Sequence, residues 1–250
     1  MTVAGRKIDF LLNGIFWLTF LVFVATQVVF VYYLVRYRRR AGQKATYSHG
    51  NNLLEIIWTT IPVLIFLGLG IYSNQVWSEI HRNPPPDAIQ VNIFSFQYGW
   101  EMRYGGADNQ LGRTVVEKIS PDNKFGVAED DPAGKDDFVS RELVIPYGKP
   151  VHVLLNSRDV IHSFYVPAFR LYQDIVPGRT ISWVWFEVER AGDLELACSQ
   201  LCGAGHYNMK APIKVVSPEE FDKWYDGKVK AAAAQASQNP STSPEIAARN

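Results

Sequence analysis

The sequence predicts a two-helix transmembrane hairpin followed by an all-β domain of the sandwich or barrel class. Two long apolar runs near the start predict the hairpin, and a series of short alternating segments separated by Gly and Pro predicts the β domain. The chain has 250 residues and a net charge of zero. The length allows more than one domain, and the charge balance excludes a general attraction to nucleic acid, so we expect no nucleic-acid partner.

The first apolar run covers residues 10–35 and contains no charged residue. As a helix it rises about 39 Å, enough to cross a bilayer with some tilt. A signal peptide is the alternative, but the run is too long for one and no small-residue cleavage site follows it. We therefore predict a transmembrane helix at 10–36, preceded by an N-terminal segment at 1–9.

The second apolar run, "LEIIWTTIPVLIFLGLGIYSNQVW", covers residues 54–77 and carries one acid, Glu55, near its start. Pro62 lies inside it, which a membrane helix tolerates when neighbouring groups satisfy the freed carbonyl. We predict a second transmembrane helix at 54–78, so that the two spans form a hairpin.

The predicted loop at 37–53 sets the orientation of this hairpin. Its region holds five Lys and Arg residues, from Arg36 to Lys44, and no acid. Short basic loops stay in the cytoplasm. Arg6 and Lys7 before the first span argue weakly for the opposite orientation. We expect both termini and the following domain to lie on the outer side of the membrane.

Residues 79–230 form the predicted β domain. After the proline-containing spacer "HRNPPPDA", four segments show alternation with β-branched and aromatic residues: 89–104, 142–157, 180–199 and 211–217. Residues 105–137 are polar and rich in Gly and Asp, which predicts an inserted surface loop. The domain has a net charge of −5. This charge is compatible with a basic docking partner and equally with a solvated surface that binds no partner.

Two further features end the chain. Ser217, with Pro218 and Glu220 after it, is typical of a helix start, and we expect a short helix to about Trp224 or Tyr225. Residues 231–250 are of low complexity, which predicts a disordered tail. No Cys-x-x-Cys-His motif is present, so we expect no haem attached to this chain.

The stretch "CSQLCGAGHYNM" holds both cysteines of the chain, Cys198 and Cys202, together with His206 and Met209. Intervals of four, four and three residues would place all four on one helix face. Two glycines within the stretch would cost such a helix about 2 kcal/mol. Since the stretch also lies between two predicted strands, we predict a ligand-bearing loop.

Two thiolates, an imidazole and a thioether are soft ligands that suit copper. His162 lies upstream, in "DVIHSFYVPAF", where a mononuclear copper site would take its second imidazole. The extra cysteine would allow two copper ions to share two bridging thiolates. A disulfide between Cys198 and Cys202, a redox dithiol and a zinc site remain the alternatives.

With these motifs the sequence resembles subunit II of the haem–copper terminal oxidases, the cytochrome c oxidase family. The resemblance extends to about residue 230 and rests on the copper-type loop, on "DVIHSFYVPAF", on "QDIVPGR" (173–179) and on "LEIIWTTIP" at the second span. It implies a cupredoxin-like domain, with a Greek-key topology, after the hairpin. It also implies an integral protein of a bacterial cytoplasmic or mitochondrial inner membrane, in contact with membrane lipid.

The resemblance implies a dinuclear copper centre, CuA, in which the two cysteines bridge the ions. The implied ligands are His162, Cys198, Gln200 through its main-chain carbonyl, Cys202, His206 and Met209. The centre would receive electrons from cytochrome c or a similar donor and pass them to the haems of subunit I, where oxygen becomes water. Subunit III is a further implied partner, and Glu55 matches an acid at the cytoplasmic mouth of a proton channel into subunit I.

The sequence departs from the family pattern at two places. Most members have Glu at position 200, where the carboxylate helps to hold a magnesium or manganese ion; Gln200 puts that site in question, although Asp174 and Arg179 could still form a polar network there. The aromatic run at electron entry is "QYGW", with Tyr98 and Trp100 at the family's tryptophan positions. Both rings could instead be packing residues of the sandwich.

Two other functions are compatible with parts of this pattern. The electron-entry subunit of a nitric oxide or nitrous oxide reductase shares the copper loop but generally lacks this hairpin with a Glu such as Glu55. The equivalent subunit of quinol oxidases is a scaffold that has lost the copper ligands, whereas every ligand position is filled here.

Overall fold

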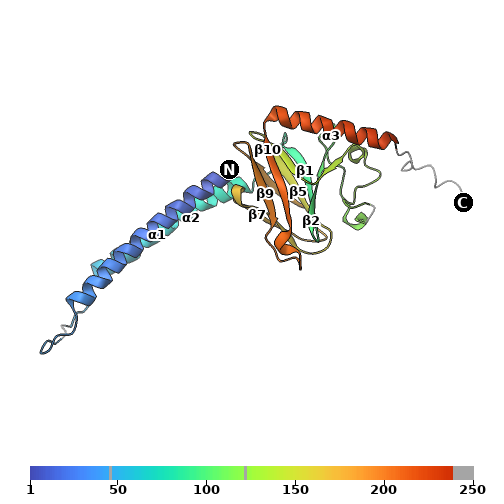
Figure 1. The fold of residues 1–250 in the computed structure, drawn as a ribbon. Helices are drawn as coiled ribbons and strands as arrows, with labels where there is room; N and C mark the ends of the chain where they lie inside the picture. Colours follow the sequence, from blue (N-terminus) through green and yellow to red (C-terminus); the bar gives the residue numbers. More distant parts are fainter. Residues whose placement is uncertain (45–46, 121–122, 239–250) are drawn as a thin grey trace. The chain divides into compact units, whose positions relative to one another are not determined.

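The computed structural model describes residues 1–44, 47–120 and 123–238 (Figure 1). The chain divides into two compact units. Residues 6–80 form a helical unit, and the first five residues join the chain from His81 onward in a second unit that contains the β-sheets. The expected order of an apolar hairpin followed by a β domain is confirmed.

The helical unit consists of α1 (Val3–Arg36) and α2 (Asn52–Ile80). Helix α1 starts well before the apolar run because Thr2 caps it: the Gly5 N–H donates to Thr2 Oγ1 at 2.9 Å. The helix therefore includes most of the segment at 1–9 that we predicted to precede it. Asn51 caps α2 in the same way, since the Leu54 N–H donates to Asn51 Oδ1 at 3.1 Å.

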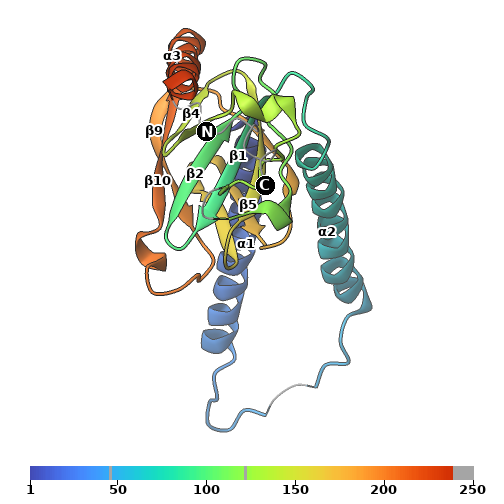
Figure 2. The same ribbon diagram turned by 90° about the vertical axis from the view of Figure 1, so that its right-hand side faces the viewer.

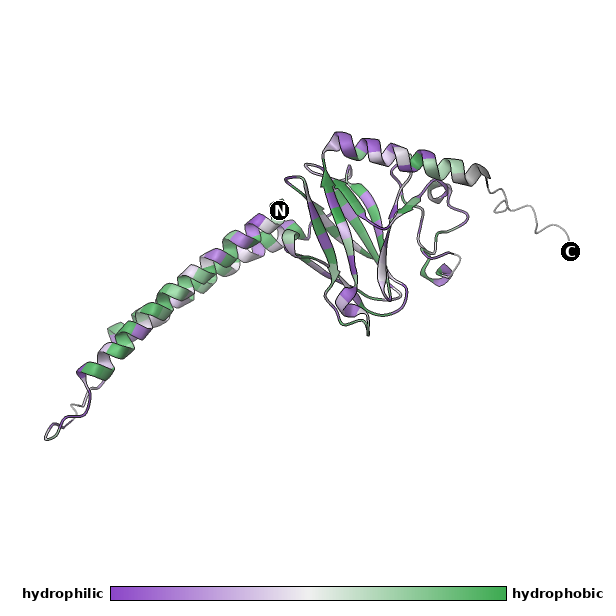
Figure 3. Cartoon of the chain, viewed as in Figure 1, coloured by the Kyte–Doolittle hydropathy of each residue, from purple (hydrophilic) through white to green (hydrophobic). Residues whose placement is uncertain are grey.

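Both helices are long and apolar enough to cross a membrane. Their apolar side chains are exposed along almost the whole length. The hydropathy colouring shows hydrophobic residues along most of both helices (Figure 3). The Phe10 and Tyr72 rings meet edge to face at 6.1 Å, and Lys7 forms an ion pair with Glu79, so the start of α1 lies beside the end of α2. The pair is therefore an antiparallel hairpin whose surface suits a hydrocarbon environment.

The β unit contains two five-stranded sheets, ordered β3-β2-β1-β5-β8 and β4-β10-β9-β6-β7 (Figure 2). The strands are β1 (Ile89–Phe96), β2 (Gly99–Tyr104), β3 (Phe138–Ser140), β4 (Leu143–Pro146), β5 (Pro150–Ser157), β6 (His162–Val166), β7 (Leu171–Ile175), β8 (Ile181–Glu187), β9 (Gly192–Cys198) and β10 (Lys210–Val216). The pairs β1–β5 and β4–β10 are parallel and the others antiparallel. Alternating apolar residues of both sheets, such as Val91, Ile93, Leu196 and Ile213, are completely buried between them.

The described residues of the segment at 105–137 are irregular, as predicted, with two short 3₁₀ helices, η1 (Val116–Lys118) and η2 (Pro132–Lys135). It is not only a surface loop. Arg103 and Asp137 form a buried ion pair at 2.7 Å, and the Phe125 ring packs on Phe94 with ring centres 5.2 Å apart. These contacts anchor the segment on the first sheet.

The closing helix α3 (Pro218–Gln238) has the predicted start, because the Glu220 N–H donates to Ser217 Oγ and the Ser217 N–H to the Glu220 carboxylate, both at 3.2 Å. It continues well past the predicted end at Trp224 or Tyr225. The prediction of a disordered tail from 231 was wrong for 231–238, which belong to α3. This part contains a run of alanines, and alanine has the highest helix propensity of all residues. Residues 239–250 of that predicted tail lie outside the described residues.

Candidate metal centre

The strand pair β6–β9 brings the distant histidine to the cysteine loop. The strands are antiparallel, with Phe164 opposite Cys198, so the first residue of β6 lies beside the last residue of β9. Those residues are His162, which is fully buried, and Cys198. Sheet pairing therefore joins two groups that are 36 residues apart in the sequence.

The stretch after Cys198 is a loop, as predicted, and the helical alternative is wrong. Residues 199–205 have no regular structure, a single 3₁₀ turn, η4 (His206–Asn208), follows, and β10 begins at Lys210. The Cys198 N–H donates to the Met209 carbonyl at 3.0 Å and closes the base of the loop. Cys202 and Met209 are buried, whereas His206 is half-buried.

The two cysteines are free thiols whose sulfurs lie 3.8 Å apart, well beyond the roughly 2.05 Å of a disulfide. Each sulfur faces a different imidazole. The distance from Cys198 Sγ to His162 Nδ1 is 3.9 Å, and from Cys202 Sγ to His206 Nδ1 it is 3.6 Å. Met209 Sδ lies 3.7 Å from Cys202 Sγ, and the Gln200 carbonyl oxygen 3.1 Å from Cys198 Sγ.

These distances fit a shared metal site. Nitrogen and sulfur ligands bound tetrahedrally at about 2.0–2.3 Å from one ion lie about 3.5 Å from each other. The donor atoms of His162, Cys198 and Cys202 all lie within 4.8 Å of one another. Thiolates, imidazoles and a thioether are soft ligands that copper prefers, so the donor set suits copper better than a hard cation.

Asp159 fixes which nitrogen of His162 faces the cysteines. Its Oδ1 lies 2.9 Å from His162 Nε2, which leaves Nδ1 directed toward Cys198. Partial burial raises the pKa of Asp159, but hydrogen bonds from the Gln97 N–H and from His162 outweigh it, and the net pKa is below its ordinary value. Asp159 is therefore a charged acceptor for this imidazole.

Burial raises the pKa of the Cys202 thiol to about 11, and the neighbouring Cys198 thiol, through a hydrogen bond and its charge, raises it further in the same direction. Without a metal, Cys202 therefore carries its proton at neutral pH. A bound cation would take the place of this proton, as is general for thiolate ligands.

The turn at Gln97 and Tyr98 contacts the loop that follows Cys198. Gln97 Nε2 donates to the Cys202 carbonyl at 2.6 Å. The Tyr98 ring lies directly on two glycines: a Cβ atom would fall 2.4 Å from Tyr98 Oη at Gly203 and 2.5 Å from a ring carbon at Gly205. Sequence reasoning used these glycines only as evidence against a helix and did not find Gln97 or Asp159 as contacts of the site.

The two candidate electron-entry aromatics differ in their surroundings. Trp100 is buried in β2, with its ring 6.3 Å from the His162 ring in an edge-to-face arrangement. Tyr98 is 44% exposed and lies on the copper-type loop. Trp100 is therefore a packing residue that also touches the site, and Tyr98 provides an aromatic surface beside it.

The remaining candidates lie outside the cluster. Asp174 is opposite Ser163 in the β6–β7 register, one position from His162, and accepts from Tyr172 Oη at 2.6 Å. Arg179 follows β7 in a turn, and within the described residues its side chain forms no ion pair. Glu55 is exposed in the first turn of α2 and belongs to the helical unit.

Fold and site together define a two-span membrane protein with a cupredoxin-like domain that carries a Cys/His/Met cluster able to hold a metal ion. The family model of the cytochrome c oxidase subunit II transmembrane domain matches residues 2–76, and that of its periplasmic domain matches residues 113–217. The chain belongs to the cytochrome c oxidase subunit II family.

Two curated relatives agree with this assignment. The chain is 38% identical to the alternative cytochrome c oxidase subunit 2 of Bradyrhizobium diazoefficiens, over 88% of this chain and 79% of that protein. It is 32% identical to cytochrome c oxidase subunit 2 of Cereibacter sphaeroides, over 82% and 72%. The crystal structure of the periplasmic domain of cytochrome oxidase subunit II from Bradyrhizobium japonicum covers 59% of this chain and 97% of its own, at 27% identity and a TM-score of 0.43.

Family membership makes this chain an electron-transfer subunit of an oxidase, which is an oxidoreductase complex of the haem–copper type. Copper binding follows from the family, and the described residues contain a His/Cys/Cys cluster that could hold a metal ion.

Proposed function

We propose that the cluster holds a dinuclear copper centre, CuA, through which this chain takes electrons from cytochrome c or a similar donor and delivers them to the haems of subunit I for the reduction of oxygen to water. The observation that carries the proposal is the pairing of each cysteine sulfur with its own imidazole, His162 for Cys198 and His206 for Cys202, with 3.8 Å between the sulfurs. Two metal positions that share two sulfurs account for this pairing. Bound copper would supply reversible one-electron chemistry.

The protein's own residues would keep the centre nearly unchanged during that chemistry. Cys198 and Cys202 would bridge the ions, His162 and His206 would end the ligand set, and the Met209 thioether and the Gln200 carbonyl would be weak ligands. The sheet already positions His162 and Cys198. A ligand set that exists before electron arrival needs little reorganisation, which favours fast transfer at a small driving force.

The proposal extends to the electron donor and the neighbouring subunits. Tyr98 supports electron entry beside the loop, because its ring is exposed and lies on Gly203 and Gly205. Trp100 would support the path inward. Subunits I and III would be the partners in the membrane. Because Gln200 has no carboxylate, a magnesium or manganese site at the interface with subunit I would depend on other groups, such as Asp174.

The orientation is proposed from charge. The basic loop between the helices favours a cytoplasmic position, so that both termini and the copper domain lie outside, in a bacterial cytoplasmic or mitochondrial inner membrane. Glu55 would then lie on the cytoplasmic side, where it would accept protons for a channel of a proton-pumping oxidase.

Copper content and electron paramagnetic resonance test the central claim. The purified, copper-loaded chain should bind two copper ions and give a seven-line mixed-valence spectrum. One copper per chain, or a four-line spectrum, would contradict a dinuclear centre. The complex should consume oxygen; turnover of nitric oxide without oxygen consumption would assign the chain to a reductase instead.

A further inference from the structure

The turn between β1 and β2 holds the cysteine loop through one glutamine side chain. Gln97 is exposed at this turn, yet its Nε2 donates to the Cys202 carbonyl oxygen at 2.6 Å. In the part of the chain that the structure describes, Gln97 is the one residue outside the loop that forms a hydrogen bond with the main chain of Cys202. The contact therefore orders a long side chain that would otherwise keep its rotamer freedom in water.

The same residue also reaches the histidine side of the cluster. The Gln97 main-chain N–H donates to Asp159 Oδ2 at 2.8 Å, and Asp159 Oδ1 lies 2.9 Å from His162 Nε2. Gln97 thus uses its main chain toward the sheet-held imidazole and its side chain toward the loop-held cysteine. A substitution of the side chain removes the second contact and keeps the first, since every residue except proline has a main-chain N–H.

The loop lies closely against this amide at the residue after Cys202. A Cβ atom at Gly203 would fall 2.9 Å from Gln97 Nε2 and would also meet the Tyr98 ring. The φ of Gly203 is 136°, a conformation that glycine adopts far more readily than residues with a Cβ. Both the hydrogen bond and the close contact therefore restrain the position of Cys202.

This restraint affects the distance between the two thiols. The sulfurs of Cys198 and Cys202 lie 3.8 Å apart, and a disulfide would need them to approach to about 2.05 Å. Cys198 ends β9 and is held by the sheet, so the approach depends mainly on movement of Cys202 with its loop. Disulfides form readily on the outer side of a membrane, where the proposed orientation places this domain, and one here would remove two metal ligands at once.

We propose that Gln97 is a positioning residue for this cluster. Its amide holds Cys202 away from Cys198, so that both thiols stay reduced and in place until a metal ion binds. That this ion is copper in a dinuclear centre rests on the proposed function, whereas the effect of Gln97 on the metal-free thiols does not.

The first measurement uses the purified full-length chain without metal, with glutathione disulfide as the oxidant. Each intramolecular disulfide consumes two cysteine thiols and one glutathione disulfide and releases two glutathione thiols. In Gln97→Leu the rate of this reaction should rise about two- to tenfold, the effect of one lost hydrogen bond. Gln97→Asn should behave in the same way, because its amide is one methylene shorter and falls short of the Cys202 carbonyl.

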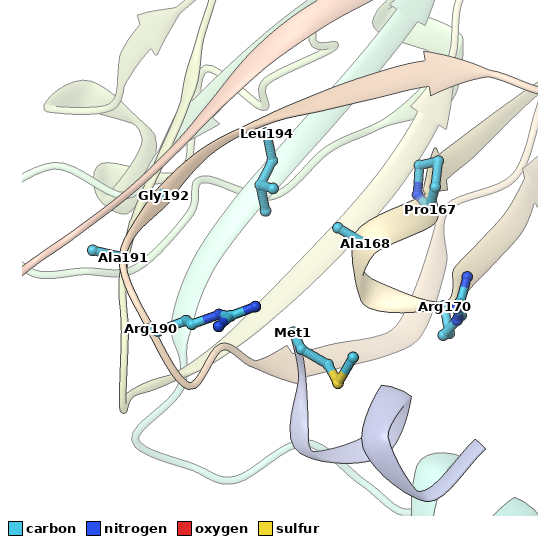
Figure 4. Close-up of a pocket in the computed structure, with 8 residues that line it drawn as sticks. All are labelled: Met1, Pro167, Ala168, Arg170, Arg190, Ala191, Gly192 and Leu194. Atoms are coloured by element: carbon cyan, nitrogen blue, oxygen red, sulfur yellow. The ribbon is translucent and has the colours of Figure 1, made fainter. Parts of the chain in front are cut away.

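Gln173→Leu is the matched control. The Gln173 side chain also donates through Nε2 to a main-chain carbonyl, that of Asp174, at 3.0 Å, and its other hydrogen bond is with Trp183. Arg190→Gln is a distant control, because Arg190 precedes the start of β9 and lines an open cavity of about 620 Å³ there (Figure 4). Both controls should form the disulfide at the parent rate. Equal acceleration in Gln173→Leu would indicate a general loosening of the domain and would overturn the proposal.

The second measurement follows copper in the loaded chain. Gln97→Leu exchanges one neutral side chain for another, so it should keep the copper content of the parent but release copper to a chelator about two- to tenfold faster. A parent-like rate of disulfide formation in Gln97→Leu would mean that the side chain only fills space, and the proposal would be wrong. A parent chain that binds a single copper ion would contradict the dinuclear centre instead, and the metal-free measurement would still decide the role of Gln97.

Discussion

The two halves of the metal centre are positioned by different means. His162 and Cys198 end paired strands and are buried in the sheet, with His162 completely enclosed. Cys202, His206 and Met209 come from a loop, and His206 is only half-buried. One half is therefore a product of the sandwich itself, whereas the other depends on contacts that hold a loop against it.

A short chain of polar contacts joins these halves. The Asp159 carboxylate contacts His162 Nε2 through Oδ1 and accepts from the Gln97 N–H through Oδ2 at 2.8 Å. The Gln97 side chain in turn reaches the Cys202 carbonyl. The turn at 97–98 thus reaches His162 through Asp159 and contacts the loop at Cys202 directly. A variant that alters one half should therefore have a different effect from a variant that alters this connection.

The largest expected difference is between His162→Ala and His206→Ala. Both should lose the two-copper spectrum, with copper affinity reduced by more than about tenfold. Only His162→Ala should also destabilise the metal-free protein, by about 2 kcal/mol or more, because it opens a buried cavity and removes the contact between the imidazole and Asp159.

Thermal unfolding of the metal-free chains measures this difference. His206→Ala should change the free energy of unfolding by no more than about 0.5 kcal/mol, as expected for a partly exposed loop residue. Equal destabilisation by the two variants would show that the loop is as integral to the fold as the sheet.

Gly205→Ala tests the loop half alone. The φ of Gly205 is −89°, so alanine fits the backbone, and the three atoms nearest to the added Cβ all belong to the Tyr98 ring. We expect copper affinity to fall at least about tenfold, since overpacking of this kind costs about 1–3 kcal/mol. Isothermal titration with copper would measure it.

The Gly205→Ala/Tyr98→Ala double variant provides the control, because the ring that causes the clash is gone. It should recover most of the lost copper affinity. Failure to recover would mean that the glycine is needed for a reason other than contact with Tyr98.

The sequence predicted the residues that the structure brings together in both halves, but not the residues that support them. Soft ligands at close spacing are visible in a linear pattern, and so is the alternation of the main strands. The contact between Asp159 and His162, and that between Gln97 and Cys202, depend on which turns the sheets bring together. Short strands such as β6 have too few residues for a clear alternation, and β6 was not predicted although it carries His162.

Asp159→Asn tests the connection between the halves. Asparagine can still accept from His162 but has no charge, so we expect copper to remain bound with an affinity roughly tenfold lower. Removal of a nearby negative charge favours the less positive, reduced centre, and the reduction potential should rise. Potentiometric titration of the copper absorption measures it, with Asp174→Asn as a control because Asp174 contacts Tyr172 and not the imidazole. An unchanged potential would mean that Asp159 only orients the ring.

The smallest effect on copper is expected at Gln200. Its main-chain oxygen lies 3.1 Å from Cys198 Sγ, and alanine keeps that oxygen, so Gln200→Ala should retain both copper ions and their spectrum. Loss of copper in this variant would show that the amide side chain supports the loop.

Gln200→Glu sharpens the comparison in the other direction, because it restores the carboxylate that most of the family has at this position. If the lost carboxylate is what weakens a magnesium or manganese site, complexes with Gln200→Glu grown with manganese should show a bound Mn²⁺ signal stronger than that of the parent complex, while the copper spectrum stays the same. Equal Mn²⁺ signals in the two complexes would mean that other groups determine ion binding there.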